Sequence, residues 1–387
     1  MPYVRRLRIE GLAGREDVCQ AELNEYVNVF FGANGSGKTS LLRILHSALD
    51  DNAESVREVP FTRAEVVVYS YGKKKEITYT LDKNPDAEFS QQQLIEGSSG
   101  EDDQSTFVPI RKKKRKKLTW KTDPIEVGGW FHKYLPISRL YARQPGQAAG
   151  PYYSFGSQPD LSAEGLEAQF SENLTQSWKD YSADLGREVN KAQEAGLARI
   201  LESVISRSES YPEEGSFDPR EAYQAVSNFM SRRGMSKVAL SESEFLNRYK
   251  TDQQLRSVAK DIEAVEKRIS QVTAPRDQFR DLVNQMFIGG KALSFSDKEL
   301  EIAIRDKTIS LSTLSSGEKQ LLTILVNTLI AGTAVILVDE PELSLHVDWQ
   351  RRLVSTMRTL NPRPQIIMAT HSPEIMAELP DEQIFPL

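Results

Sequence analysis

Apolar and polar residues alternate in the first part of the chain in the way expected of β-strands. Val4 to Ile9 reads VRRLRI, and a similar pattern returns in Tyr134 to Tyr141. Two β-rich runs, Glu65 to Tyr71 and Glu76 to Leu81, flank a glycine and three lysines, which predicts a hairpin. Tyr26 to Phe31 is more continuously apolar and predicts a strand that enters a glycine-rich turn.

From residue 151 to about 286 the pattern changes to that of long, polar helices. Apolar residues recur every three or four positions in two series, which are Phe170, Leu174, Trp178, Tyr181, Leu185, Val189 and Ala192, and Leu255, Val258, Ile262, Val265, Ile269 and Val272. The second series has the spacing of a coiled-coil stripe. Asp218 and Pro219 predict a helix start, and Gly234 predicts a helix end. The region is therefore either an antiparallel arm or an ordinary helical lobe.

Beyond Gly290 the β pattern resumes and alternates with helical segments. Short strands are expected at 293–295, 300–304 and 308–311, followed by an apolar helix over Leu321 to Ile330. Ala334 to Val338 is a continuous apolar run, which is typical of a buried strand of a parallel sheet, and Gln365 to Thr370, QIIMAT, predicts a further strand. These patterns predict an α/β chain with a helical insertion.

Composition and charge restrict the classes of protein to which the chain can belong. Its 387 residues exceed what one core usually supports, so two domains or a domain with an insertion are expected. A net charge of −6 argues against a globally basic nucleic-acid coat. Cys19 is the single cysteine, so a disulfide framework or C-x-x-C zinc site is excluded and a reducing, cytoplasmic location is expected. No segment has the pattern of a signal peptide or a membrane span.

The strand over Tyr26 to Phe31 leads into GANGSGKT, a complete match to G-x-x-x-x-G-K-[ST]. Glycines in such a turn are expected to allow positive φ and to bring backbone N–H groups close to phosphate oxygens. Lys38 would reach the β- and γ-phosphates, and Thr39 would bind Mg²⁺. The residues expected to bind nucleotide here are Gly32, Asn34, Gly35, Ser36, Gly37, Lys38, Thr39 and Ser40.

Three further motifs follow in the last quarter of the chain. LSSGEKQ, from Leu314 onward, places small residues at a helix start, where free N–H groups attract anions. Asp339 and Glu340 follow a buried strand; Asp339 would hold Mg²⁺ directly or through water, and Glu340 would orient and deprotonate an attacking water. His371 ends the next strand, where its side chain would contact a γ-phosphate and the nearby water.

The strongest run of charge is RKKKRKK, which precedes Trp120 by three positions. Its residues are Arg111, Lys112, Lys113, Lys114, Arg115, Lys116 and Lys117. Seven cations beside an aromatic residue would hold a nucleic-acid backbone by displacing counterions. A solvated loop attracted to the acidic stretch just upstream explains the same run, and both interpretations stay open.

The motifs GANGSGKT, LSSGEKQ, VILVDEPE and ATHS occur in this order, with a helical insertion between the first two. In this respect the chain resembles the ATP-binding-cassette ATPases, particularly the soluble SMC, RecF and OLD branch and its stand-alone defence ATPases. The resemblance implies an α/β fold: an ABC-type P-loop ATPase head, with a mixed or parallel sheet, flanking helices, an antiparallel β subdomain and a helical, partly coiled-coil insertion. Its expected parts are residues 1–150, 151–286 and 287–387, the middle part being the insertion.

The same resemblance implies the chemistry and the assembly. Two heads would sandwich two ATP molecules with Mg²⁺, so ATP binding would close a homodimer and hydrolysis would reopen it. Ser315 and Gly317 would contact the γ-phosphate bound to Lys38 of the partner subunit, with Ser316 and Glu318 completing the signature segment. Higher oligomers would need contacts that the sequence does not locate.

Several positions depart from the family pattern. His346 stands where transporter cassettes usually have aspartate, which argues against a transporter subunit. Gln144 is the candidate for the glutamine that links Mg²⁺ to the insertion. OLD nucleases carry a TOPRIM domain after the ATPase, whereas this sequence ends at Leu387, so a built-in nuclease is not expected.

The leading hypothesis is a Mg²⁺-dependent ATPase that dimerises on ATP and acts as sensor or scaffold for a separate effector, a nuclease or a toxin, in anti-phage defence or DNA maintenance. One alternative is a DNA-binding clamp of the RecF or SMC kind, suggested by the basic run. A second is a transporter subunit, which co-purification with a membrane protein would support. A third is a non-hydrolysing, ATP-gated assembly protein.

Overall fold

The structure is a computed structural model that describes residues 2–83, 118–124, 129–136, 163–205, 218–232, 241–287, 289–296, 299–305 and 307–387. The chain forms two compact units, one made of Met1–Asn173 with Ser310–Leu387 and the other of Leu174–Ile309. The three-part division of the chain predicted from the sequence stays a prediction.

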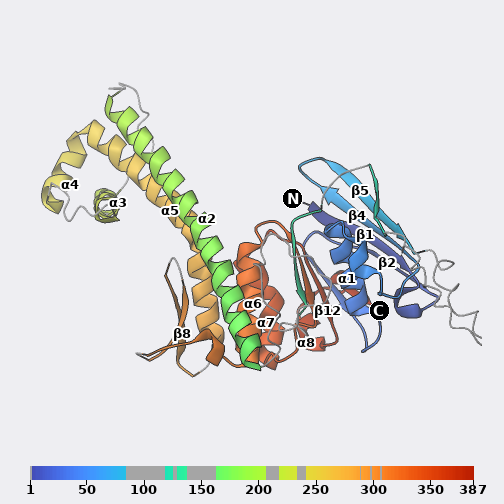
Figure 1. The fold of residues 1–387 in the computed structure, drawn as a ribbon. Coiled ribbons are helices and arrows are strands. Elements are labelled where there is room, and N and C mark those ends of the chain that lie inside the picture. The colour runs from blue at the N-terminus through green and yellow to red at the C-terminus, as the bar shows by residue number, and fades with distance from the viewer. Residues whose placement is uncertain are drawn as a thin grey trace, which may run out of the picture. The chain divides into compact units, whose positions relative to one another are not determined.

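The first unit contains a five-stranded parallel sheet in the order β13-β3-β12-β11-β7. Its strands are β3 (Val27–Phe31), β7 (His132–Pro136), β11 (Val335–Asp339), β12 (Ile366–Thr370) and β13 (Ile384–Pro386). Every residue of β11 and β12 is buried, as expected for central strands covered on both faces. The helices of this unit are α1 (Lys38–Leu49), α6 (Ser316–Ile330), α7 (Val347–Leu360) and α8 (Pro373–Met376) (Figure 1).

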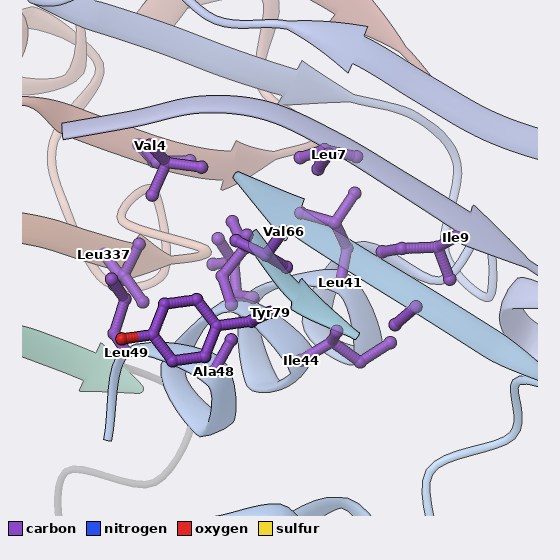
Figure 2. Packing of buried hydrophobic residues seen from close by; sticks show 14 of the residues in the cluster. Val4, Leu7, Ile9, Leu41, Ile44, Ala48, Leu49, Val66, Tyr79 and Leu337 are labelled. Carbon is purple, nitrogen blue, oxygen red and sulfur yellow. The ribbon is translucent and has the colours of Figure 1, made fainter. Parts of the chain in front are cut away.

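A five-stranded antiparallel sheet in the order β2-β1-β4-β5-β6 completes the first unit. Its strands are β1 (Pro2–Glu10), β2 (Val18–Glu22), β4 (Arg63–Ser70), β5 (Lys75–Asp82) and β6 (Lys121–Asp123). Helix α1 packs against both sheets, and its buried leucines and isoleucine meet Val66 of β4 and Leu337 of β11 in one apolar cluster (Figure 2). This cluster fixes the first helix after the glycine-rich turn with respect to both sheets.

The second unit consists of helices and a small sheet. Its helices are α2 (Ala163–Ile205), whose first turns belong to the first unit, α3 (Pro219–Arg232), α4 (Glu242–Thr251) and α5 (Gln253–Met286). Strands β8 (Lys291–Phe295), β9 (Leu300–Ile304) and β10 (Lys307–Ile309) form an antiparallel sheet in the order β10-β9-β8. Helices α2 and α5 run antiparallel, because Trp178 meets Phe279 with ring centroids 5.9 Å apart while Gly196 lies against Val265.

The structure confirms the predicted fold class: an α/β head with a parallel sheet, an antiparallel β subdomain and a helical insertion. The hairpin predicted around residue 72 is the β4–β5 pair, and α3 begins at Pro219 with the Asp218 carboxylate accepting a hydrogen bond from Arg220 N at 2.9 Å. Three members of the predicted stripe on α5, Ile262, Val265 and Ile269, are buried in an apolar cluster. Gly234 lies outside the described residues. None of the helices described is long and apolar enough to cross a membrane.

Candidate nucleotide-binding site

The predicted site residues follow three neighbouring strands of the parallel sheet. Strand β12 pairs with β3 on one side and with β11 on the other, and both pairings are parallel. The carboxyl ends of these strands therefore meet at one edge, where an α/β sheet places its ligands. Gly32 follows β3, Glu340 follows β11 and His371 follows β12. The topology thus brings together motifs that are more than 300 residues apart.

The glycine-rich loop differs from the prediction in one respect. Gly35 and Gly37 have φ of 85° and 96°, so these two positions use the conformational freedom of glycine. Gly32 does not have a positive φ. A Cβ on Gly32 would lie 2.7 Å from Ser36 Oγ, so this position requires glycine for space. The expectation of positive φ at Gly32 was wrong, because the sequence motif does not distinguish the two reasons for glycine.

Lys38 is the first residue of α1, and its side chain is turned back onto the loop that precedes it. Its Nζ donates hydrogen bonds to the carbonyl oxygens of Gly32 and Ala33, at 2.8 and 2.9 Å. The residue is 4 % exposed. A buried ammonium group held by two carbonyl oxygens is positioned to exchange them for the stronger, charged oxygens of a phosphate.

A second loop, the 3-10 turn η1 (Leu12–Gly14), covers the glycine-rich loop. A Cβ on Gly37 would lie 3.1 Å from side-chain atoms of both Leu12 and Ala13. The guanidinium of Arg15 donates a hydrogen bond to the carbonyl oxygen of Ser36. Arg15 was not among the predicted site residues, since nothing in the sequence near β1 indicates contact with a loop twenty positions later.

Thr39 and Asp339 form the part of the site that suits a metal ion. Thr39 Oγ1 donates to Asp339 Oδ1 at 3.2 Å, and Asp339 Oδ2 is buried without a hydrogen-bond partner. Burial is the main reason why the pKa of Asp339 is raised to about 6, with the charge of Glu340 adding to the effect. A hydroxyl and a buried carboxylate with an unsatisfied oxygen fit Mg²⁺, which binds few protein oxygens and completes its shell with phosphate and water.

Glu340 sits directly after Asp339 with an unusual backbone conformation. Its φ is 46°, in the left-handed region, while its N–H donates to Ala369 O at 2.7 Å. A non-glycine residue in this conformation stores strain, which structures commonly retain at functional positions. Glu340 lines a hollow whose other members belong to η1, the glycine-rich loop and the start of α1, namely Ala13, Gly35, Gly37, Lys38, Thr39 and Ser40.

His371 is held by a residue that the sequence reasoning did not include among the site residues. Glu342 Oε1 lies 2.8 Å from His371 Nδ1 and also accepts a hydrogen bond from His371 N at 2.7 Å. Glu342 is 6 % exposed, and its other oxygen, Oε2, is buried without a partner. The only signal in the sequence was the second glutamate of the DEPE segment.

The signature segment lies at the start of α6 in the same unit. Ser315 and Glu318 form a capping box: the Ser315 hydroxyl accepts from Glu318 N at 3.3 Å, and Ser315 N donates to Glu318 Oε2 at 2.9 Å. Gln320 Nε2 donates to Pro341 O at 2.7 Å. A Cβ on Gly317 would lie 2.3 Å from Ser344 O. The signature helix is thus packed onto the loop that follows Glu340.

Two predictions fall outside the part of the chain that the structure describes. These are Gln144 and the basic run from Arg111 to Lys117. Within the described ranges, no group of three or more His, Cys, Asp or Glu side chains is placed to hold a metal ion. A magnesium ion at Asp339 and Thr39 would therefore depend on nucleotide oxygens for most of its ligands.

The chain is similar to one described family and to several known proteins. The family described as "AAA domain, putative AbiEii toxin, Type IV TA system" matches residues 27–377. The "Retron Vc95 probable ATPase" of Vibrio cholerae serotype O1 biovar El Tor is 21% identical over 384 residues, covering 92% of this chain and 68% of that protein. The "Retron Ec83 probable ATPase" of Escherichia coli is 27% identical over 120 residues, covering 27% of this chain and 22% of that protein.

Among solved structures, one match is an Smc head domain with an extended coiled coil, derived from Pyrococcus furiosus and bound to the C-terminal domain of ScpA. The TM-score is 0.44 and the sequence identity is 14%, and the match covers 97% of this chain and 92% of that one.

Proposed function

This chain belongs to the AAA-domain family whose description names the AbiEii toxin and Type IV TA systems, and on that premise we propose that it is a Mg²⁺-dependent ATPase. ATP binding closes a dimer of two heads, and the dimer acts as sensor or scaffold for a separate effector in anti-phage defence. The effector is a nuclease or a toxin.

One observation carries the catalytic part of the proposal: the edge of the parallel sheet gathers a phosphate loop, a buried carboxylate with an unsatisfied oxygen, and a second carboxylate. Lys38 and the loop N–H groups bind the β- and γ-phosphates. Thr39 and Asp339 would hold Mg²⁺, which when bound would supply positive charge against the charge that develops on the phosphate oxygens. Glu340 lines the same hollow and is positioned to orient the attacking water and accept its proton.

His371 would contact the γ-phosphate and the nearby water through its second ring nitrogen. Glu342 accepts from Nδ1 of the imidazole, so Nε2 is the ring nitrogen that remains for other partners. A histidine fixed in this way loses little rotamer freedom when it makes such a contact, which is the advantage of a preorganised side chain.

The dimer part of the proposal is supported by the position of the signature segment. The N-terminus of α6 presents the exposed small residues Ser315 and Ser316, and a helix N-terminus suits an anion. In the first unit it packs onto the loop after Glu340 rather than forming part of the hollow around Lys38. A second copy that supplies its own α6 N-terminus to this hollow would complete the phosphate site.

The defence part of the proposal is supported by names alone. The matched family is described by a toxin and a toxin–antitoxin system, and the two curated relatives are named as retron ATPases. Those words describe these proteins, and fold and family do not by themselves specify a biological role.

Phosphate release and molecular mass together test the proposal. Purified protein should release phosphate from ATP with Mg²⁺, and Lys38→Ala and Glu340→Gln should lose this activity for different reasons. Glu340→Gln keeps the phosphate and metal ligands, so its mass should double with ATP and Mg²⁺, whereas the mass of Lys38→Ala should not change.

The outcomes separate the alternatives. Negligible phosphate release by the unmodified protein, with ATP-dependent doubling of mass, would replace the ATPase by a non-hydrolysing assembly protein. Phosphate release that depends on added duplex DNA, and that is lost when Arg111 to Lys117 are neutralised, would favour the clamp. Absence of ATP binding would contradict the ATPase, the non-hydrolysing assembly protein and the DNA-binding clamp alike.

A further inference from the structure

A groove lies between α2 and α5 in the second unit, where the two helices run side by side (Figure 1). Its volume is about 450 Å³. Its charged lining residues are Glu188, Lys191 and Arg199 of α2 and Lys267 and Arg268 of α5, and it is called the α2–α5 groove below. The residues of the nucleotide site belong to the first unit, so this groove is not part of that site.

The floor of the α2–α5 groove offers little to an apolar partner. Gly196 is buried against Val265, which brings the two helices close together there. Apart from Val265, which is 4 % exposed, the apolar side chains that line the groove within the described residues are alanines. Protein partners are usually anchored by aromatic or large side chains in a pocket, and unpaired bases are anchored by aromatic rings. The groove therefore offers charge in place of an apolar or stacking contact.

The cations of the groove are exposed, and three of them have no acidic partner. Lys191 Nζ lies 2.7 Å from Glu188 Oε1. Among the described residues, Arg199, Lys267 and Arg268 form no salt bridge. The pKa of Glu188 is lowered, mainly by its hydrogen bond to Lys191, and Arg268 adds to the effect from the other helix. A single carboxylate thus faces four cations, so the lining carries a net positive charge.

The four cations are spread along the groove rather than gathered at one point. Lys191 and Arg199 are eight residues apart, which corresponds to about 12 Å along α2. Lys267 and Arg268 come from the opposite helix, directly beyond Val265. A single phosphate group cannot span this distance, whereas a chain that carries a negative charge on each unit contacts several of the cations at once.

We propose that the α2–α5 groove binds the phosphate backbone of nucleic acid without regard to base sequence. Lysines and arginines that neutralise phosphates release condensed counterions, and this release drives binding without any contact to a base. An acidic protein segment would meet the same cations but would find no pocket for an anchoring side chain. The proposal does not depend on ATP hydrolysis, and it concerns a different part of the chain from the basic run at residues 111–117.

Fluorescence anisotropy without nucleotide tests the proposal. The probes are two labelled DNA duplexes of about 20 base pairs and unrelated sequence, each titrated with the full chain at several salt concentrations. Both duplexes should bind with the same affinity. Arg199→Gln, Lys267→Gln and Arg268→Gln each replace a cation by another helix-forming residue, and each should reduce the slope of log affinity against log salt concentration by about 0.9. Lys179→Gln, at an exposed lysine of α2 outside the groove, should leave the slope unchanged.

Glu188→Gln should change binding in the opposite direction. The substitution removes the carboxylate of the groove and releases Lys191 from its ion pair, so both duplexes should bind more tightly and the slope should become steeper. A pair that served helix stability alone would not strengthen binding when broken. Far-UV circular dichroism of each variant shows that its helices are retained.

Three results would each overturn the proposal. The first is no binding of either duplex by the unmodified chain, or a marked preference for one sequence. The second is an unchanged slope in Arg199→Gln and Lys267→Gln, which would place the binding elsewhere in the chain. The third is binding of a labelled polyglutamate peptide as tight as that of the duplexes and weakened by the same substitutions, which would assign the groove to an acidic protein segment.

Discussion

His371 Nδ1 lies 2.8 Å from Oε1 of Glu342, and the same oxygen accepts the backbone N–H of His371 at 2.7 Å. One buried carboxylate oxygen thus fixes both the ring and the backbone of the residue that ends β12. Because Glu342 lies three residues after Asp339, the loop after β11 and the loop after β12 are joined at this point. Glu342 therefore holds the two loops together at their starts.

Glu342→Ala should lower phosphate release while ATP binding is retained. Without the carboxylate the imidazole is free to rotate or to change tautomer, and we expect a loss of about 10- to 100-fold, as when an orienting partner of a histidine is removed. Glu342→Gln keeps an acceptor oxygen and should lose less. Steady-state kinetics should assign the loss to kcat rather than to KM. Equal activity of Glu342→Ala and the unmodified protein would show that His371 needs no such partner.

Asp339→Asn should make the protein without Mg²⁺ more stable at pH 7. Burial raises the pKa of Asp339 to about 6, above its ordinary value of 3.8, so the ionised side chain opposes folding above pH 6. The corresponding free energy is about 3 kcal/mol at pH 7, and it falls to about 0.5 kcal/mol at pH 4, where the carboxyl is protonated in the folded state and about half protonated in the unfolded state.

Urea unfolding at pH 7 and pH 4 measures this effect. The stability of Asp339→Asn should exceed that of the unmodified protein by much more at pH 7 than at pH 4, and the variant should lose Mg²⁺-dependent ATP binding. A variant that is less stable at pH 7 would show that the Asp339 carboxylate is satisfied in solution.

Glu340→Gly should be more stable than Glu340→Ala. Both substitutions remove the side chain, but only glycine relieves the left-handed conformation, with φ of 46°. Relief of about 1–2 kcal/mol, reduced by the extra freedom of glycine in the unfolded chain, leaves about 1 kcal/mol in favour of glycine. Thermal unfolding of the two variants measures the difference, and equal midpoints would contradict the assigned strain. Both variants should be inactive.

Much of the head could be predicted from sequence because its signals are local. The run from Val335 to Asp339 is apolar at every position but the last, so it predicts a buried strand with a carboxylate at its end. The glycine-rich loop is a short motif with a fixed role for each position. Once the strands are known to be parallel, the meeting of their carboxyl ends follows from topology.

The parts that were missed depend on contacts between distant segments. The bonds from Glu342 to His371 span 29 positions, and the hydrogen bond from Arg15 to Ser36 spans 21. Neither residue type signals such a contact, because most glutamates and arginines are exposed. The steric reason for glycine at position 32 was missed similarly, since the neighbouring Ser36 side chain is visible only in the folded loop.

The pH dependence of stability should differ between the unmodified protein and His46→Gln. His46 Nδ1 lies 2.6 Å from His132 Nε2, and His132 Nδ1 lies 2.7 Å from Trp130 O, so both rings are held between α1 and β7. Burial is the main reason why the pKa of His46 is lowered to about 3, with His132 and Arg43 adding to it. The pKa of His132 is lowered too, mainly by burial, although nearby Asp50 opposes this and Lys133 adds to it.

Because the folded pKa of His46 lies below the unfolded value of 6.5, the unfolded state binds more protons as the pH falls below 6.5. Folding should then lose about 2 kcal/mol between pH 7 and pH 5 from His46 alone. Chemical denaturation at both pH values measures the free energy of unfolding. Between pH 7 and pH 5 this free energy should fall by about 2 kcal/mol less in His46→Gln than in the unmodified protein. Equal losses of stability in the two proteins would show that His46 is accessible to protons in the folded state.

Gly186 and Gly196 of α2 should respond in opposite ways to alanine. A Cβ on Gly186 would meet nothing within 4 Å, so Gly186→Ala should stabilise the protein by about 0.5–1 kcal/mol through helix propensity. A Cβ on Gly196 would lie 2.0 Å from a methyl group of Val265, so Gly196→Ala should force α2 and α5 apart and destabilise by about 1–3 kcal/mol.

The double variant Gly196→Ala/Val265→Ala provides the decisive control, because it removes the methyl groups that the new Cβ would meet. Val265 is 4 % exposed, so Val265→Ala alone should also destabilise, by creating a cavity. If the two helices are packed as closely as the glycine indicates, the double variant should be more stable than the sum of the single losses predicts. Additive losses in urea unfolding would show that Gly196 and Val265 are not in contact in solution, and would contradict the close antiparallel packing of α2 and α5.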